Sequence, residues 1–159
     1  MALFLSTYVN KVDRKGRVSV PAAWRAVLTA DSPKGENFQG IVAYSSFVHS
    51  CIEACGLARI QLLSDSIDAL DPFSDERDAF ATAILGGSQQ LPFDPEGRVG
   101  LPQELMEAAC ITEQAAFVGK GATFEIWEPK AYAEYAAKAR EAAKAKRGAL
   151  RLAGKGDAT

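Results

Sequence analysis

The sequence predicts an α+β fold that contains two copies of one half-domain. Residues 13–21 (DRKGRVSVP) recur 81 positions later as residues 94–102 (DPEGRVGLP), with Asp, Gly, Arg, Val and Pro identical among the nine positions. Asp accepts hydrogen bonds from backbone N–H groups two residues on, Gly adopts positive φ, and Pro fits the first turn of a helix. Each copy is therefore interpreted as strand, tight turn with Gly-Arg, short strand and Pro-started helix.

Local patterns extend the first copy in both directions. The loose alternation around Tyr8 and Val9 is typical of a strand, and Trp24, Val27 and Leu28 share one side of a helix. In order, the predicted elements are a strand over residues 4–12, a turn over 13–16, a strand over 17–20, a helix over 21–28, a loop over 31–35, and a hairpin with strands over 41–44 and 48–52.

Two helices are predicted between the copies. Apolar residues recur at helical spacing from Leu57 to Leu70, and Asp71-Pro72 ends this stretch. Ser74 is a suitable N-cap for a second helix, which Gly86-Gly87 ends. The second copy then follows with a strand over residues 89–93, a turn over 94–97, a helix after Pro102, and a hairpin with strands over 115–119 and 123–127.

A change of composition at Pro129 marks the last segment. Residues 130–147 are rich in strong helix formers, and Tyr132 and Tyr135 are candidates to anchor one face of this helix. Residues 148–159 are predicted to be disordered. The predicted organisation is a first half-domain over residues 3–55, linking helices over 56–87, a second half-domain over 88–135, and a basic tail over 136–159.

The small net charge of −2 conceals a strong asymmetry. Residues 1–129 hold 10 Lys and Arg against 17 Asp and Glu, a balance of −7, whereas residues 130–159 hold 8 against 3, a balance of +5. Within the acidic body, the cations Lys11, Arg14, Lys15 and Arg17 lie within seven consecutive positions around the first repeated turn. This local cluster is the clearest candidate for contact with a polyanion.

Membrane insertion and secretion are not indicated. No apolar run approaches the roughly 20 residues needed to span a bilayer. The segment Met1 to Leu5 is too short and too uncharged for a signal peptide. A cytoplasmic protein that has no membrane partner is therefore expected.

The cysteines and the histidine do not predict a metal or catalytic site. Cys51, Cys55 and Cys110 are odd in number, which argues against a disulfide scaffold. His49 with Cys51 and Cys55 supplies only part of a zinc site, and the chain has no second histidine. Cys51 and Cys55 are therefore read as small apolar residues. Without a nucleophile motif or a Gly-rich phosphate loop, we expect no enzyme, no cofactor and no small-molecule substrate.

The repeated Asp-x-x-Gly-Arg-x-x-x-Pro motif resembles that of the MraZ family of bacterial DNA-binding proteins. The resemblance covers residues 3 to 135 and includes Trp24-Arg25 and the hairpin sequence Phe124-Glu125-Ile126-Trp127-Glu128. It implies an AbrB-like swapped-hairpin barrel, with both interlocked halves in one chain and helices at the periphery. The family usually has Gly at the position of Ser6, so a different strand path is expected there.

The resemblance implies a transcriptional regulator bound to double-stranded DNA at the nucleoid. It further implies a ring-shaped homo-oligomer that reads direct repeats, and repression of a cell-division and cell-wall gene cluster. The alternative is an antitoxin-like protein that neutralises a toxin and regulates its own synthesis. We expect DNA contacts from Arg17 and Arg98, whose forked donors suit guanine edges or phosphates, and phosphate contacts from Lys11, Arg14 and Lys15.

A second interpretation of the arginines remains open. Asp13, Gly16, Asp94 and Gly97 are expected to hold the two turns, and the arginines then have the option of pairing with these aspartates inside the fold. The second turn carries Pro95-Glu96 in place of basic residues, so the two copies are not expected to contribute equally to DNA contact. The basic tail is either a solvated helix with a flexible end or a source of non-specific phosphate attraction.

Overall fold

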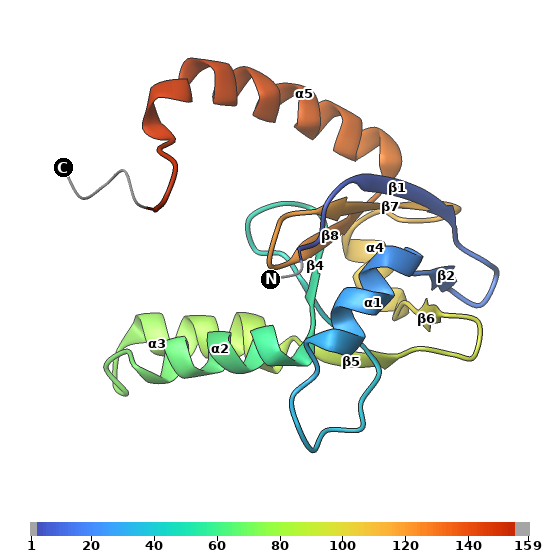
Figure 1. The fold of residues 1–159 in the computed structure, drawn as a ribbon, viewed down its shortest axis with the longest axis horizontal. Helices are drawn as coiled ribbons and strands as arrows, with labels where there is room; N and C mark the ends of the chain where they lie inside the picture. The colour runs from blue at the N-terminus through green and yellow to red at the C-terminus, as the bar shows by residue number, and fades with distance from the viewer. Residues whose placement is uncertain (1–2, 155–159) are drawn as a thin grey trace. The chain divides into compact units, whose positions relative to one another are not determined.

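Strands from the two halves of the chain are interleaved in one antiparallel sheet (Figure 1). The computed structural model describes residues 3–154, which form two compact units divided between Pro129 and Lys130. The first half contributes β1 (Thr7–Lys11), β2 (Arg17–Ser19), α1 (Ala22–Ala30), β3 (Gly40–Ser45) and β4 (Ile52–Cys55). The linking segment forms α2 (Leu57–Asp68), α3 (Asp75–Phe80) and the π-helix η1 (Ala81–Gly86). The second half contributes β5 (Gln89–Pro92), β6 (Arg98–Gly100), α4 (Gln103–Ala108), β7 (Gln114–Gly119) and β8 (Phe124–Trp127).

The strand order shows that the halves are interlocked. The six-stranded sheet runs β1-β7-β8-β4-β3-β5, so β1 of the first half pairs with β7 of the second, and β5 of the second pairs with β3 of the first. The short strands β2 and β6 form a separate two-stranded ribbon. The α+β swapped-hairpin fold implied by the resemblance is therefore confirmed. In the described residues, however, the strands form an open sheet with edges at β1 and β5 together with this ribbon, and not the closed barrel that was expected.

A pseudo-twofold axis relates the two halves. Val18 and Val99 occupy the same position in the repeat, and they pair with each other at the centre of the β2–β6 ribbon. Glu53 and Glu125 are each the second residue of their strands, and they too pair with each other, between β4 and β8. A residue that pairs with the equivalent residue of the other half must lie beside the twofold axis. The axis therefore passes through the β2–β6 pair and through the β4–β8 pair.

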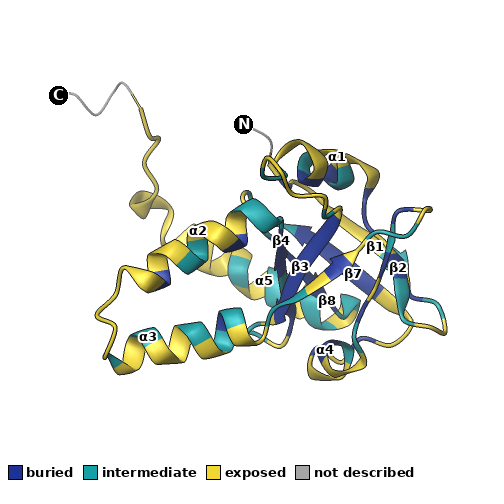
Figure 2. Ribbon diagram, turned by 90° about the horizontal axis from the view of Figure 1, so that it is seen from below, coloured by how far each residue is buried: buried dark blue, intermediate teal, exposed yellow. Residues whose placement is uncertain are grey.

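The main core lies between the sheet, the ribbon and helices α1 and α4 (Figure 2). Trp24 of α1 packs against Phe124 with ring centroids 4.9 Å apart and against Phe4 at 5.5 Å. The indole Nε1 of Trp24 donates a hydrogen bond to the carbonyl oxygen of Leu5 at 3.0 Å, which satisfies the polar atom of this buried ring. The aromatic cluster thus fixes α1, which directly follows the first copy of the repeated motif, against strands β7 and β8 of the second half.

A second apolar cluster covers the other face of β3. It contains Val42 and Tyr44 of that strand together with side chains of α2 and η1. Because β3 is covered on both faces, its residues 40–44 are all buried. Helices α2 and α3 form an antiparallel pair that extends from this cluster and is largely exposed along its length (Figures 1 and 2).

Several element predictions are confirmed and two boundaries differ. Ser74 caps α3, since its Oγ accepts a hydrogen bond from the N–H of Arg77 at 3.2 Å. The predicted strand over residues 48–52 is wrong, because β4 begins only at Ile52. The residues before it form a bend in which Ser46 Oγ accepts the N–H groups of Val48 and His49, both at 3.1 Å. The predicted helix after Ser74 changes from α-helix to π-helix at Ala81.

Ser6 keeps the backbone conformation that a glycine would adopt. Its φ is +78°, in the left-handed region that costs a residue with a Cβ roughly 1–2 kcal/mol. The backbone on either side stays paired, because Phe4 bridges to Gly121 and Ser6 accepts the N–H of Gly119 at 2.9 Å. Ser6 is thus accommodated by its positive φ, and the pairing of the neighbouring backbone does not require a different strand path there.

The second unit contains one long helix. Helix α5 (Pro129–Ala145) begins at Pro129, as predicted, and Arg147–Ala149 form a short 3₁₀ turn, η2. Gly148 and Ala149, at the start of the segment predicted to be disordered, therefore belong to this turn. Residues 150–154 have no regular secondary structure, and residues 155–159 lie outside the described residues. Among the described helices, none combines the length and the apolar character required to cross a bilayer.

Candidate nucleic-acid interface

Asp13 holds the first repeated turn together. Its Oδ1 accepts the backbone N–H of Lys15 at 2.9 Å and that of Arg17 at 2.8 Å. The N–H of Gly16 donates to the carbonyl oxygen of Asp13 at 3.0 Å, and Gly16 has a φ of +79°. The hydrogen bond from the backbone N–H of Arg17 is the main cause that lowers the pKa of the Asp13 carboxyl below its ordinary value of 3.8. The residue types in the motif are thus the ones that this turn requires.

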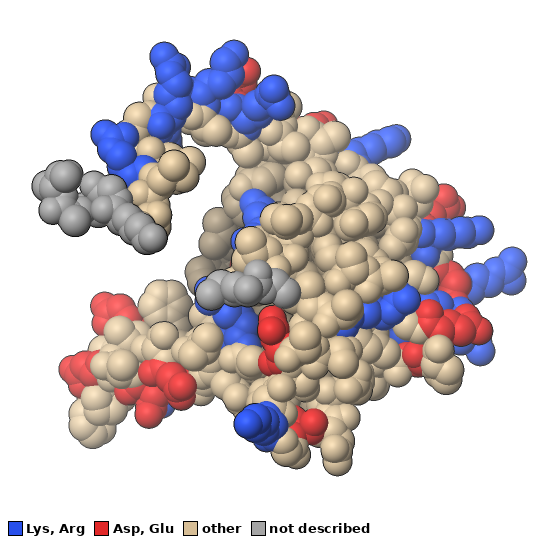
Figure 3. Space-filling view, viewed as in Figure 1, with Lys and Arg blue, Asp and Glu red and all other residues tan. Residues whose placement is uncertain are grey.

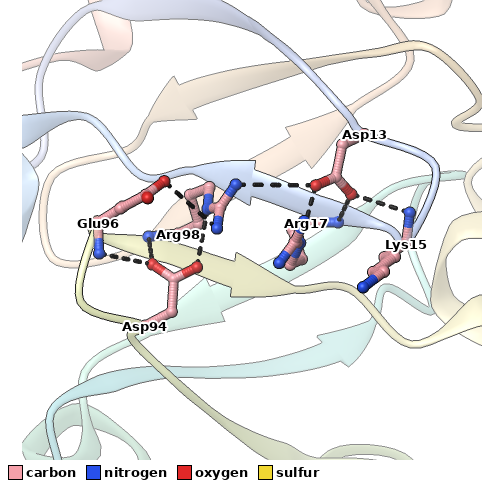
Figure 4. Close-up of polar contacts among 6 residues, drawn as sticks. All are labelled: Asp13, Lys15, Arg17, Asp94, Glu96 and Arg98. Carbon is pink, nitrogen blue, oxygen red and sulfur yellow. Dashed lines mark hydrogen bonds and ion pairs between the residues drawn. The ribbon is translucent and has the colours of Figure 1, made fainter.

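The second turn repeats this geometry closely. Asp94 Oδ1 accepts the N–H groups of Glu96 and Arg98, both at 2.9 Å, and Gly97 has a φ of +78° (Figure 4). The backbone N–H of Arg98 is again the largest cause of a lowered pKa, here that of Asp94. The roles predicted for the two aspartates and two glycines match the positions they occupy in these turns.

Both arginines pair with the aspartate of their own turn. Arg17 Nε lies 2.8 Å from Asp13 Oδ2, and Arg98 Nε lies 2.8 Å from Asp94 Oδ2. Within the described residues, Arg17 makes no second ion pair, and its side chain is 38% exposed. Arg98 also contacts Glu96 Oε2 at 3.3 Å and Asp13 Oδ2 at 3.8 Å, and is 25% exposed. Its hydrogen bond to Asp94 raises the pKa of Arg98.

The β2–β6 ribbon brings the two arginines onto one surface. Val18 and Val99 are buried at its centre. Because side chains alternate along a strand, Arg17 and Arg98 lie on the opposite, outward face. The other two residues of the ribbon on that face, Ser19 and Gly100, are small.

The predicted phosphate contacts lie beside this ribbon. Lys11, at the end of β1, and Arg14 and Lys15, in the turn, are all exposed. Lys11 and Arg14 line one surface depression together with Glu113. Figure 3 shows Lys and Arg side chains mixed with Asp and Glu at this end of the first unit. The fold therefore gathers all five predicted cations around the two turns, with carboxylates among them.

Arg25 is a cation near the second turn that sequence reasoning did not select as a site residue. It lies on α1, partly buried, and donates a hydrogen bond to the carbonyl oxygen of Val20. Its guanidinium packs so closely on Gly97 that a Cβ there would lie 2.7 Å from Arg25 Nε. The glycine of the second turn therefore serves this close approach as well as positive φ. The sequence feature that could have indicated this role is the position of Arg25 directly after Trp24, within the part of the chain that resembles the family.

Two of the three cysteines, Cys51 and Cys55, lie in the interior of the fold. Among the residues that the structure covers, no three His, Cys, Asp or Glu side chains form a metal-binding group. Cys51 and Cys55 are buried, and burial raises the pKa of each thiol to about 12. Both are therefore protonated at neutral pH and pack as small apolar side chains.

Comparison with known proteins identifies the family. A family model described as "MraZ protein, putative antitoxin-like" matches residues 84–152. The transcriptional regulator MraZ of Rickettsia canadensis is 54% identical over 153 residues, which is 96% of this chain and 99% of that protein. The chain belongs to the MraZ family. The MraZ protein of Rickettsia africae, also named a transcriptional regulator, is 54% identical and is matched over 96% of this chain and 99% of its own length. That of Rickettsia typhi is 52% identical over 95% of this chain and 98% of its own length.

Proposed function

We propose that this MraZ-family chain is a transcriptional regulator that binds duplex DNA with the outward face of the β2–β6 ribbon and the turn before β2. The observation that carries the proposal is the position of Arg17, on an exposed ribbon whose backbone is fixed by the Asp13 turn. A two-stranded ribbon fits the major groove of B-DNA, where base edges are read. The names of the relatives, all transcriptional regulators, support the same function.

The pairing of Arg17 with Asp13 is compatible with DNA contact. The pair uses Nε, so the two Nη groups remain as a forked donor, and the carboxylate fixes the orientation of the guanidinium plane. Such a fork suits the O6 and N7 atoms of guanine. The Nη groups of Arg98 face Asp13 and Glu96 instead. Arg17 is therefore proposed as the principal reader of sequence and Arg98 as its assistant.

Lys11, Arg14 and Lys15 are proposed to contact phosphates, which position a protein on DNA without reading its sequence. Asp13 and Asp94 hold the turns and do not contact DNA. Because residues 1–129 carry a balance of −7, one subunit offers weak net attraction to a polyanion. Several subunits on one duplex gain avidity from high effective concentration. A ring in which each subunit reads one direct repeat places several subunits on one duplex. The ring is proposed to act at the nucleoid in the cytoplasm and to repress a cell-division and cell-wall gene cluster.

A second candidate function is neutralisation of a toxin. It is favoured by the antitoxin-like description of the matching family model. Co-purification with a small nuclease-like protein, whose activity falls when this chain is added, would support it. Absence of such a partner under conditions where the chain binds DNA would leave regulation as the function.

The decisive test is a gel shift on the DNA upstream of the gene that encodes this chain, with scrambled DNA as competitor. The wild-type chain should bind that DNA in preference to the competitor. Arg17→Ala should lose this preference while it retains its circular dichroism spectrum and its mass in solution. Arg59→Ala, which changes an exposed arginine of α2, is the matched control and should bind as wild type does. Equal binding of Arg17→Ala and wild type would refute the assigned reading role, and unfolding of Arg17→Ala would favour a structural role for this arginine.

A further inference from the structure

The α2–α3 pair exposes a large aromatic side chain at the turn between its helices. Phe73 lies between the end of α2 and the start of α3, and its side chain is 94% exposed. Leu70, nearby in the chain, is also exposed. A protruding phenylalanine gains free energy only when another surface covers it, so such a residue commonly marks an interaction site.

Acidic side chains surround this phenylalanine. Residues 71–78, here named the hairpin tip, contain four Asp and Glu and a single cation, Arg77. The guanidinium of Arg77 pairs with Asp68 of α2 at 3.3 Å. Figure 3 shows Asp and Glu side chains gathered over this helical pair. A surface that covers Phe73 must therefore be basic as well as apolar.

The second unit carries a surface of the complementary kind. A groove of about 810 Å³ has a floor of small and apolar side chains, contributed by Ala139, Ala142, Ala143 and Leu150. Lys138, Lys146 and Arg147 line the same groove. Leu150 is 82% exposed, so the groove is open to a partner. The small alanine side chains leave room for an aromatic ring close to the helix backbone, and the cations of the groove are opposite in charge to the acidic neighbours of Phe73.

We propose that the hairpin tip of one copy of this chain binds the α5 groove of the next copy, with Phe73 in the groove and its acidic neighbours against Lys138, Lys146 and Arg147. The proposal rests on the oligomer included in the proposed function and assigns its contact surfaces. Two tips repel each other, because four carboxylates outnumber the single Arg77 in each, and two grooves repel each other through their lysines and arginines. The contact is therefore head-to-tail, the type of contact that closes into a ring when its rotation permits.

The test exchanges the charges of the two surfaces. A tip variant carries Asp71→Lys, Asp75→Lys and Glu76→Lys, and a groove variant carries Lys138→Glu, Lys146→Glu and Arg147→Glu. Each variant alone juxtaposes like charges and should have the mass of a single chain by light scattering, under conditions where wild type is an oligomer. An equimolar mixture restores opposite charges at every contact and should recover an oligomer of alternating subunits. This rescue separates a broken contact from a misfolded variant.

An uncharged substitution tests the aromatic part of the contact. Phe73→Ser should lower the oligomer mass, whereas Val48→Ser, which removes an apolar side chain 65% exposed in the turn between β3 and β4, should leave it unchanged. The proposal is overturned if wild type is monomeric, if either charge variant keeps the wild-type mass, or if the mixture fails to assemble. Binding to a short duplex with one site should persist in both charge variants, so failure of the contact and failure of DNA binding are measured separately.

Discussion

Asp13 of the first repeat lies 3.8 Å from Arg98 of the second, measured from Oδ2 to Nη1. The same oxygen accepts the Nε–H of Arg17 at 2.8 Å. One carboxylate thus faces both guanidinium groups of the outward ribbon face, whereas Asp94, among the residues that the structure describes, forms an ion pair with Arg98 only. The backbone of the two turns follows the pseudo-twofold symmetry, but their ion pairs do not, because Asp13 faces an arginine of each repeat.

Replacing Asp13 by Asn should reduce both thermal stability and DNA affinity. The amide oxygen can still accept the N–H groups of Lys15 and Arg17, but the negative charge that orients Arg17 and faces Arg98 is lost. Asp94→Asn is the matched control, since it changes the equivalent turn and leaves Arg17 paired. We expect the larger loss of sequence-specific affinity for Asp13→Asn, as measured by titration of a labelled duplex. A larger loss for Asp94→Asn would assign sequence reading to the second repeat instead.

Acid should destabilise the protein through both turns. Each aspartate has a pKa in the folded chain below its ordinary value of 3.8. Their stabilising contribution is therefore complete above about pH 4 and is lost as the pH falls through the lowered pKa, because the unfolded chain binds these protons at a higher pH. Denaturant midpoints measured from pH 5 downward should fall less steeply for an Asp13→Asn, Asp94→Asn double variant than for wild type. If the denaturant midpoints of the two proteins fall equally with pH, the two aspartates are not the source of the acid destabilisation.

The turns were predictable from sequence, whereas the contacts between the repeats were not. Asp, Gly and Arg at fixed spacing dictate a local hydrogen-bond pattern, so the structure of each turn follows from nine residues. The approach of Asp13 to Arg98 depends on the register of β2 against β6, which is set by packing across 81 positions of sequence. The late start of β4 and the packing of Arg25 on Gly97 are likewise tertiary effects that no local pattern reports.

Ser6→Gly should stabilise the fold. Ser6 has a φ of +78°, a conformation that glycine adopts without steric cost. Relief of this strain is worth about 1 kcal/mol, which corresponds to a rise in Tm of roughly 2–4 °C for a chain of this size. Ser19→Gly, in strand β2, is the control and should lower Tm, because glycine weakens a strand interior. A fall in Tm for Ser6→Gly would show that the serine side chain contributes more than its backbone strain costs.

Removal of the residues after Ala136 tests the basic tail in DNA binding. On a short duplex with one site, where assembly does not enter, we expect truncation to leave the dependence of log K on log salt unchanged, because the cations of α5 are assigned to the contact between copies. A lower slope for the truncated chain would show that the tail contacts phosphates. A solvated tail predicts the same slope for the truncated and the full chain. An unchanged slope would therefore exclude a DNA role for this segment and leave α5 free for contacts between copies.

Lys15→Ala should weaken binding to specific and scrambled DNA by a similar factor. Lys15 is exposed in the first turn, and its backbone N–H, which the substitution retains, is what bonds to Asp13. Loss of one phosphate contact should reduce the salt slope by about 1 while the preference for the specific site stays unchanged. Lys34→Ala, in the loop after α1, is the control and should leave both quantities at their wild-type values. If Lys15→Ala instead removes the preference and keeps the slope, the lysine reads bases, and sequence recognition extends from the ribbon into the turn.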